Sequence, residues 1–544
     1  MTAPSRLRIA GGTVYDPANR VDGVVRDVCI EGDHIVAELP ADAPRLDARG
    51  MVVMPGGVDI HAHLAGGSVN HARRLLPEEH ADAPAPAPRL PDGAPARSGT
   101  EGTVPSTFAT GYRYAGLGYT TVMEAAVAPL MARHAHAELD DTPIVDAGCF
   151  ILLGNDDFLL RQIAAGEMAR AQDYAAWLLG ATRGYAIKIV NPGGVAVWKG
   201  GGPQRNVSAL DDAVGSSRVT PRKILETLAA AANALALPHP VHVHCNNLGQ
   251  AGNATTTLAS MQALAGQRAH FTHLQFHSYG GTPGQGWSSA ARDVIAYVNA
   301  HADVSVDIGQ VMFGPATTVT ADAPVEHLLH TSSGRKWVNV DIELETGCGI
   351  VPYTYKETAA IAALQWAVGL ELFLLAQDPW RVVLSTDHPN GGTFRSYPEL
   401  IRLLMDRTYR DERLKRVNQK LLAGSALLDG LEREYTLGEI ATVTRAAPAR
   451  LLGLAHKGHL GPGADADVTI YATDADRAKM FATPRYVLKA GVLVVEEGQL
   501  RRAPVGRRLA VRPAYDAAVT KDLKRFFDDY ATVAFENYGV EHLA

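Results

Sequence analysis

The stretch "VVMPGGVDIHAHLAGG", residues 52–67, decides the fold. It is an apolar strand pattern that closes on glycines, with His61 and His63 one residue apart near its end. Because side chains alternate along a strand, these two imidazoles should point to the same side while Ala62 points away. Two imidazoles that face the same way at a strand end can share a metal ion. The pair alone is a weak signal, since two hydrogen-bonded histidines would give the same pattern.

The region around this stretch, from about residue 57 to 450, alternates short β-rich runs with longer helical patterns. The runs include "TTVMEAAV" (120–127) and "ADVSVDIG" (302–309), and a typical helical pattern is "TPRKILETLAAAANALAL" (220–237). Repeated strand–helix alternation predicts a parallel sheet, and at this length it favours a closed barrel over an open one. The predicted fold class is therefore α/β, with a (β/α)8 barrel.

The two chain ends predict a second, smaller domain. Residues 1–56 contain short strands with turn signals, and strand patterns resume in 453–512 after the helical pattern that ends in "PARLLGL". We expect a small β-sandwich assembled from both ends, with the barrel, 57–452, inserted between them. Residues 513–544 should form a helical tail.

One stretch directly after the first barrel strand has no periodicity. It is "LLPEEHADAPAPAPRLPDGAPARSGTEG", residues 75–102, which is rich in proline, alanine and glycine. This composition predicts a long loop. A lid or partner contact and a plain surface insertion are equally open interpretations, because the loop lies on the face where barrel enzymes carry their sites.

Composition limits the classes of function. The chain has 544 residues with a formal net charge of -7, which gives no electrostatic reason to expect nucleic acid. The apolar stretch 358–376 is interrupted by Gln365 and Glu371, so we expect a buried helix and no membrane segment. No signal peptide is visible, and the scattered cysteines fit a reducing compartment; they are Cys29, Cys149, Cys245 and Cys348. A soluble cytoplasmic protein is expected.

A lysine stands inside another strand pattern, "YAIKIVNPGG" (185–194). A buried ammonium is costly without a partner, so Lys188 is either ion-paired or has its charged end at the surface. The third interpretation is a lysine with a depressed pKa that has reacted with CO2. Such a carbamate would turn a cation into a carboxylate able to bridge two metal ions.

Histidines mark the next two strand patterns. "PVHVHCNNLG" (240–249) places His242 and His244 on one face, with His244 nearer the end. In "AHFTHLQFH" (269–277), His270 and His273 are an odd number of residues apart and should point to opposite sides, whereas His273 shares a face with His277.

The last barrel strand pattern, "WRVVLSTDHPNGG" (380–392), ends in Asp387 and His388. A carboxylate at this place can bind a metal and also carry a proton. Histidine, lysine and aspartate side chains at five strand ends together predict a metal site.

These motifs resemble the amidohydrolase superfamily over nearly the full chain. The resemblance is carried by "LDARGMVVMPGGVDIHAHL" and "KGHLGPGADADVTIY", and by the order of histidine, lysine and aspartate along the strands. It implies a binuclear site with a carboxylated lysine as the bridge. The implied ligands are His61, His63, Lys188, His244, His273 and Asp387, with His242 and His270 as less favoured alternatives.

The barrel motifs point to a narrower group. "KIVNPGGVAVWKGG", "VHVHCNNLGQAGNATTTL", "HFTHLQFHSYGG" and "STDHPNGGTFRSYPELI" resemble the A subunits of formylmethanofuran dehydrogenase and of the bacterial formyltransferase/hydrolase complex. Frequent alanine and arginine favour the bacterial complex. The resemblance implies two zinc ions with a bridging water, and Asp387 as the proton carrier. The reaction that the resemblance implies is hydrolysis of an N-formyl group on a methanofuran- or methylofuran-type carrier. It also implies partner subunits of the B, C and formyltransferase D types.

Four polar residues just past the ligand strands could contact the substrate, although shaping turns is an equally good explanation. They are Asn246, Asn247, His388 and Asn390.

Three other functions are retained as alternatives. The same site in a dehydrogenase complex would condense formate with the amine. A hydantoinase-like hydrolase of cyclic amides would share every ligand, and only the flanking motifs argue against it. A non-catalytic scaffold subunit would keep the fold, but such relatives usually lack ligands, and here all six positions are filled.

Overall fold

The computed structural model describes residues 6–81, 90, 100–201, 207, 209–283, 285–340 and 348–541. Its centre is a parallel sheet of eight strands, and a parallel bridge between Ala62 and His388 joins the first strand to the end of the last, which closes the barrel. The predicted (β/α)8 barrel is confirmed. In chain order the strands are β6 (Gly57–Ala62), β7 (Tyr119–Val127), β8 (Asp146–Leu152), β9 (Ala186–Val190), β10 (Val241–His244), β11 (Ala269–Phe271), β14 (Val304–Asp307) and β18 (Val382–Val383).

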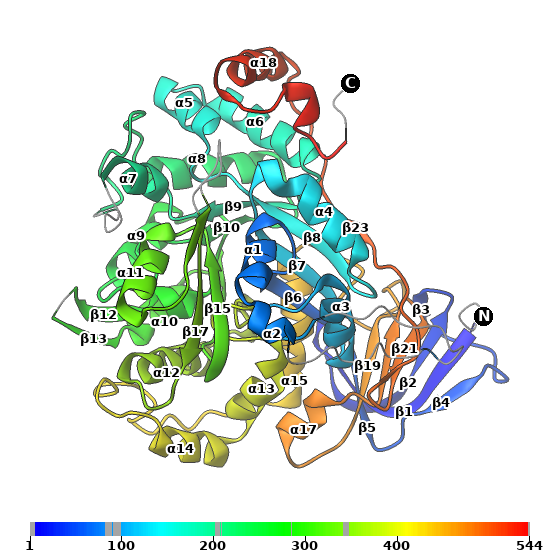
Figure 1. Ribbon diagram of the computed structural model, residues 1–544. Helices are drawn as coiled ribbons and strands as arrows, with labels where there is room; N and C mark the ends of the chain where they lie inside the picture. The colour runs from blue at the N-terminus through cyan, green and yellow to red at the C-terminus, as the bar shows by residue number, and fades with distance from the viewer. Residues whose placement is uncertain are drawn as a thin grey trace.

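Helices surround this barrel (Figure 1). Helix α8 (Pro221–Ala234) illustrates why they form: Thr220 accepts a hydrogen bond from the Lys223 amide, Pro221 occupies the first turn, and Ile224 and Leu228 face the core. The other outer helices include α3 (Thr107–Gly116), α4 (Ala132–Asp141), α5 (Asp157–Ala165), α6 (Met168–Ala181), α7 (Gly194–Gly201), α9 (Ala254–Ala263), α10 (Ala291–Ala300), α12 (Ala360–Leu375), α13 (Tyr397–Met405) and α14 (Arg407–Arg416).

The small domain is one nine-stranded sheet built from an N-terminal segment and a segment near the C-terminus. Strands β5 and β19 pair antiparallel and join the N-terminal part to the C-terminal part. The expected small β-domain built from both ends is confirmed, while the exact domain boundaries stay predictions. The strands are β1 (Arg6–Asp16), β2 (Val21–Glu31), β3 (His34–Val36), β4 (Arg45–Asp47), β5 (Met51–Pro55), β19 (Val468–Ala472), β20 (Tyr486–Lys489), β21 (Val492–Glu496) and β22 (Gln499–Leu500).

A buried cluster of charges ties the two parts together. The Lys457 ammonium lies 2.6 Å from Asp146 on barrel strand β8, and 2.9 Å and 2.7 Å from Asp465 and Asp467 beside the small sheet. Lys489 adds contacts of 2.8 Å to Asp146 and 2.9 Å to Asp467. All five side chains are buried, so each charge depends on the others for compensation.

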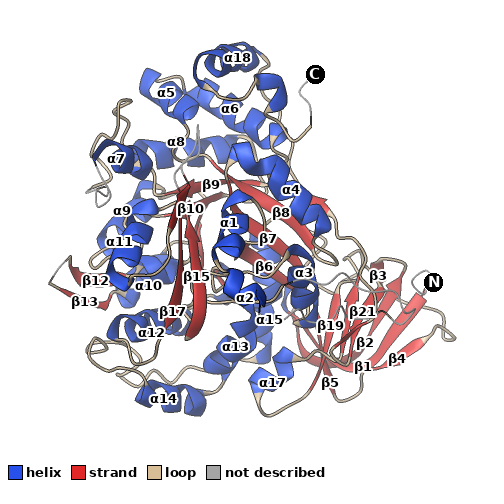
Figure 2. Ribbon diagram, viewed as in Figure 1, coloured by secondary structure: helices blue, strands red, loops and turns tan. Residues whose placement is uncertain are grey.

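An excursion that the sequence pattern did not predict covers the barrel mouth. After the seventh barrel strand the chain forms a three-stranded sheet of β15 (Gly314–Thr320), β17 (Cys348–Tyr355) and β16 (Val338–Val340), with α11 (Ala323–Ser333) packed on it. Figure 2 shows β15 and β17 standing beside α1 (Gly67–Leu75), which contacts both strands.

The loop predicted for 75–102 is wrong at its start. Leu75 ends α1, and Pro77–Ala81 forms the short helix α2. Pro77 suits the first helical position, and Glu78 and Glu79 suit the positive end of the helix dipole. Residues 82–89 and 91–99 lie outside the described residues.

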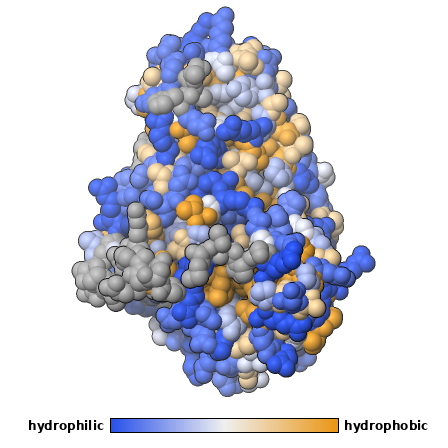
Figure 3. All heavy atoms as spheres, turned by 90° about the vertical axis from the view of Figure 1, so that its right-hand side faces the viewer, coloured by the Kyte–Doolittle hydropathy of each residue, from blue (hydrophilic) through white to orange (hydrophobic). Residues whose placement is uncertain are grey.

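Within the segment expected as a helical tail, α18 (Ala518–Tyr530) packs on α6, and its Phe526 ring lies 5.3 Å from that of Phe158 on α5. The apolar stretch expected to be a buried helix is α12, which is almost wholly buried. Among the described residues, no helix has the length and apolar character needed to cross a bilayer. The face drawn in Figure 3 is largely hydrophilic, with hydrophobic areas scattered between.

Replacing Lys457 by methionine should destabilise the protein strongly. The change leaves three buried carboxylates with less positive charge, and breaking a buried pair in this way typically costs about 3 to 5 kcal/mol. Chemical unfolding monitored by circular dichroism measures the loss, with Lys521→Met, at an exposed lysine, as the matched control. Equal midpoints for the two variants would contradict the role of the cluster.

Candidate metal centre

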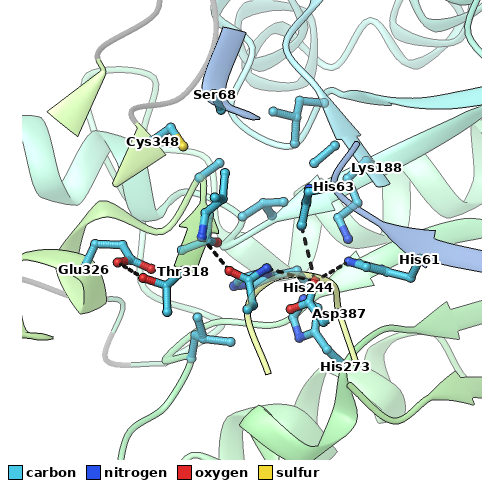
Figure 4. A pocket seen from close by; sticks show the side chains of 18 of the residues that line it. His61, His63, Ser68, Lys188, His244, His273, Thr318, Glu326, Cys348 and Asp387 are labelled. Atoms are coloured by element: carbon cyan, nitrogen blue, oxygen red, sulfur yellow. Dashed lines mark hydrogen bonds and ion pairs between the residues drawn. The ribbon is translucent and has the colours of Figure 1, made fainter. Parts of the chain in front are cut away.

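Two histidines and an aspartate meet at the closing seam of the barrel. The Nε2 atoms of His61 and His63 lie 2.9 Å and 3.3 Å from the same oxygen, Oδ1, of Asp387. All three side chains are buried, and Figure 4 shows them converging on one side of a cavity. These residues offer three ligand atoms within 4.8 Å of one another. The predicted same-side placement of His61 and His63 is what brings them together.

The Asp387 carboxylate is fixed by its neighbours. Asp387 has a left-handed backbone conformation (φ 52°), and its backbone amide donates a hydrogen bond to Ser385 Oγ at 2.8 Å. Asn390 Nδ2 donates to Asp387 Oδ1 at 2.9 Å. Burial alone would raise the pKa of this carboxyl, but the charges of His61 and His273 and the hydrogen bonds from the two strand histidines hold it well below its usual range. Asp387 is therefore ionised and suited to a cation.

Lys188 on β9 is buried beside these ligands. Its ammonium nitrogen has no hydrogen-bond partner among the described residues, and only 1 % of the residue is exposed. Burial lowers the pKa of Lys188 to about 7, against the opposing pull of Asp387, Asp307 and Glu124. A large share of the amine is therefore neutral near pH 7, which is the form that reacts with CO2.

A second group of histidines adjoins the first. His244 ends β10, and its ring centroid lies 4.6 Å from that of His273 and 5.1 Å from that of His277. These three also present ligand atoms within 4.8 Å of one another. His244 Nε2 lies 3.3 Å from Asp322, and neither ring nitrogen of His277 has a hydrogen-bond partner in the described chain.

The strand argument for His273 and His277 needs correction. Strand β11 ends at Phe271, His273 adopts a left-handed conformation (φ 35°), and Leu274–His277 form a 3-10 helix, so side chains no longer alternate there. The turn is held by Asp307, whose Oδ1 accepts a hydrogen bond from the His273 amide at 2.9 Å. His273 reaches the cavity through this turn.

His242 and His270, the alternative ligands, lie beneath the centre. His242 Nε2 is 2.8 Å from His61 Nδ1, so it contacts the side of that ring opposite Asp387. His270 Nε2 is 3.1 Å from Asp307 Oδ2, and that oxygen is also 3.7 Å from His61 Nδ1. His242 therefore contacts His61 directly and His270 is linked to it through Asp307, an arrangement typical of groups behind a metal ligand.

His63 shows how strongly this corner attracts a cation. Its Nδ1 lies 3.3 Å from Glu124, and its Nε2 faces Asp387. Burial opposes the charged imidazolium, yet the hydrogen bonds to Asp387 and Glu124 and the two charges raise the pKa of His63 to about 9. A positive charge is thus favoured at this corner, and a metal ion can supply it in place of the proton.

The four predicted substrate contacts are placed differently from one another. Asn390 lines the cavity. His388 packs its ring 4.8 Å from Phe394, outside the set of lining residues. Asn246 donates to Asn191 Oδ1 at 2.7 Å, and Asn247 lies 3.4 Å from Thr256. Both side chains therefore contact other residues of the same protein. A substrate role for any of the four stays a prediction.

Comparison with known proteins agrees with this arrangement. Residues 46–495 match the model of the amidohydrolase family. Protein FwdA of Methanocaldococcus jannaschii is 43% identical over 98% of this chain and 96% of its own length. The A subunit of the formyltransferase/hydrolase complex Fhc of Methylorubrum extorquens is 39% identical over 99% of this chain and 97% of its own.

The chain belongs to the amidohydrolase family. A solved structure extends the likeness to three dimensions: the formyltransferase/hydrolase complex (FhcABCD) from Methylorubrum extorquens in complex with methylofuran superposes with a TM-score of 0.91. That match has 38% identity and covers 98% of this chain and 96% of the other. The resemblance found in the sequence motifs is confirmed.

The donor set fits two divalent ions of the kind that this family binds. The groups around Asp387 and around His244 each offer three nitrogen or oxygen atoms, and the unpartnered Lys188 amine is buried beside them. Histidine nitrogen and carboxylate oxygen are ligands that zinc accepts.

Sequence reasoning missed several residues around the centre. Asp307 ends barrel strand β14 and Glu124 lies within β7, and neither strand carried a histidine motif, so an isolated acidic residue in an apolar strand was their only signal. Thr318, Glu326 and Cys348 line the cavity from the unpredicted excursion, and their sequence gave no periodic pattern to mark them.

Changing Asp307 to asparagine should weaken metal binding without unfolding the barrel. The amide presents hydrogens toward His61 and His270 in place of a carboxylate, and loss of such a supporting group typically costs about 10- to 100-fold in metal affinity. Competition with a chelator measures the affinity. Ser305→Ala is the matched control, because Ser305 Oγ contacts the other ring nitrogen of His270, at 2.9 Å, and the Ala269 carbonyl, at 3.5 Å, and makes no hydrogen bond to His61 in the described part of the chain. If the two variants hold metal equally well, Asp307 does not support the centre.

Proposed function

We propose that this chain hydrolyses the N-formyl group of a methanofuran- or methylofuran-type carrier and releases formate and the free amine. The observation that carries the proposal is the nearly full-length match to a component of a formyltransferase/hydrolase complex that was solved with methylofuran. The buried ligand set supports it, because every position that the family uses for a binuclear centre holds a suitable side chain.

Six residues would hold two ions, which we take to be zinc. His61, His63 and Asp387 would serve one ion, and His244 and His273 the other, with carboxylated Lys188 as the bridge. Bound ions would supply Lewis acidity for the formyl oxygen and lower the pKa of the attacking water.

The protein's own part in the reaction falls on Asp387. Its carboxylate is ionised, lines the cavity and is oriented by Asn390, so it can accept a proton from the attacking water. The same carboxyl would then deliver that proton to the leaving nitrogen. Burial of the site keeps bulk water from competing for the proton.

The proposal that a carboxylated Lys188 bridges the two ions follows from the charge that this position needs. An ammonium at position 188 would repel two cations, whereas the carbamate formed from the neutral amine and CO2 carries one negative charge. The lowered pKa of Lys188, about 7, supports this reaction at neutral pH.

We infer that the chain works within a complex. The solved relative is one component of an assembly named FhcABCD, and the match covers 98% of this chain. Partners of the B, C and D types are proposed here on that basis. A methylofuran-type carrier is the proposed small-molecule partner.

A second candidate is the reverse reaction, in which formate condenses with the carrier amine at the same site of a formylmethanofuran dehydrogenase. The observation in its favour is the identity to Protein FwdA, 43% compared with 39% for the Fhc relative. Composition favours the bacterial complex. Residue identities at the centre do not separate the two, because a catalyst accelerates both directions of one reaction.

Formate release from an N-formyl-methanofuran analogue tests the proposal. The chain is purified with its co-purifying subunits, and we expect formate from this analogue and none above background from hydantoin or dihydroorotate. Asp387→Asn keeps the shape of the side chain but cannot accept a proton, so the rate should fall on the order of 10² to 10⁴.

Two outcomes would contradict the proposal. Hydrolysis of a cyclic amide together with no formate from the analogue would favour a hydantoinase-like enzyme. A complex that retains both ions and cleaves neither substrate would favour a scaffold role.

A further inference from the structure

A buried acid stands on the cavity wall across from the metal ligands. Glu326 lines the cavity together with Thr318 and Cys348, and it is 2 % exposed. Figure 4 shows Glu326 and Thr318 on the side opposite His61 and Lys188. The wall between these two ends is mostly apolar, with Leu248, Phe276 and others among the lining residues. Neither the ligand set nor the proton carrier uses this acid.

The position of Glu326 is built into the fold. It lies in the first turn of α11 and packs on strand β17, where Gly349 leaves room for it: a Cβ at Gly349 would stand 2.2 Å from the Glu326 Cβ. Any other residue at 349 would displace the acid.

No cation accompanies this carboxyl among the described residues. The charged groups that it interacts with are Asp322 and Asp387, both acidic. Burial, together with these two negative charges, raises the pKa of Glu326 well above its usual range, against a hydrogen bond from Thr318. The charged form of this acid is therefore disfavoured in its position.

The hydrogen bonds show which atom of the acid is left for a ligand. Thr318 Oγ1 contacts both Glu326 Oε2 and the Val351 carbonyl, the latter at 3.0 Å. Thr318 Oγ1 donates a hydrogen bond to Glu326 Oε2, so this oxygen of the acid already has a partner. Glu326 Oε1 has no hydrogen-bond partner among the described residues, and a carboxyl oxygen of a residue that lines the cavity can accept a hydrogen bond from a ligand there.

We propose that Glu326 positions the substrate by accepting, through Oε1, a hydrogen bond from the N–H of the scissile formamide. This inference rests on the proposed function. In a secondary formamide, the oxygen would bind on the side of the proposed metal ions. The N–H is then the only hydrogen-bond donor that can reach another wall of the cavity. A carboxyl oxygen suits this task, because it accepts a hydrogen bond in either protonation state of the acid.

The role predicts a preference for secondary over tertiary formamides. The experiment uses the purified complex with an N-formyl-methanofuran analogue and with the same compound methylated on the formamide nitrogen, which has no N–H. The readout is kcat/KM for each compound. Where the methylated compound is not cleaved, the readout is its inhibition constant, measured with the secondary formamide as substrate. Glu326→Ala, Glu326→Gln and the wild type are compared, with Ser68→Ala as a control elsewhere on the cavity wall.

Glu326→Ala should lower kcat/KM for the secondary formamide about tenfold, as expected for the loss of one hydrogen bond. The kcat/KM or inhibition constant of the methylated compound should not change. Glu326→Gln should stay within about twofold of the wild type, since glutamine offers the same acceptor and donates to Thr318. Ser68→Ala should not change the ratio between the compounds. Circular dichroism and metal content show that each variant is folded and loaded.

Several outcomes would overturn the inference. Equal losses on both compounds in Glu326→Ala would mean a packing role only. A Glu326→Gln variant as inactive as Asp387→Asn would mean proton transfer by Glu326. If the wild type hydrolyses both compounds equally well, the positioning role is wrong but the proposed hydrolase function stands. If neither compound releases formate, the proposed function is wrong as well.

Discussion

The amine of Lys188 is buried at the centre of the barrel with no hydrogen-bond acceptor in the described chain, and the rest of the site depends on this constraint. A charged ammonium there would be poorly solvated and would face histidines that must stay neutral to bind metal. Burial therefore favours the neutral amine, and its conversion to a carbamate would turn an unfavourable buried group into the anion that two neighbouring cations need.

The proposed ligands around this lysine are held by a second layer of buried polar groups. Asp307 fixes both the turn at His273 and the ring of His61, while His242 contacts the far nitrogen of His61. Glu124 serves His63 in the same manner. The proposed ligands thus lie in or just after barrel strands, whereas the opposite wall of the cavity comes from the excursion after the seventh strand. Separate parts of the chain can therefore set the chemistry and the choice of substrate.

The sequence predicted the parts that follow from periodicity and from strand ends. His61, Lys188 and His244 lie in barrel strands and His63 directly follows one, so alternation along a strand was enough to predict that they come together. Asp387 follows strand β18 by four residues and has a left-handed backbone conformation, which alternation does not describe. His273 reached the same place by a left-handed turn that alternation does not describe. Glu326 could not have been found in this way, because its position depends on contacts between α11 and β17 that join residues distant in the sequence.

The central claim is that carboxylated Lys188 bridges two ions, and the dependence of metal binding on CO2 tests it most directly. Metal-free protein is reconstituted with zinc in bicarbonate-containing and in CO2-depleted buffer, and the bound metal is counted by elemental analysis. The account predicts close to two ions per chain with bicarbonate and fewer without it, and it predicts that Lys188→Met removes this difference. Two ions per chain in CO2-depleted buffer, or a bicarbonate effect that survives in Lys188→Met, would contradict it.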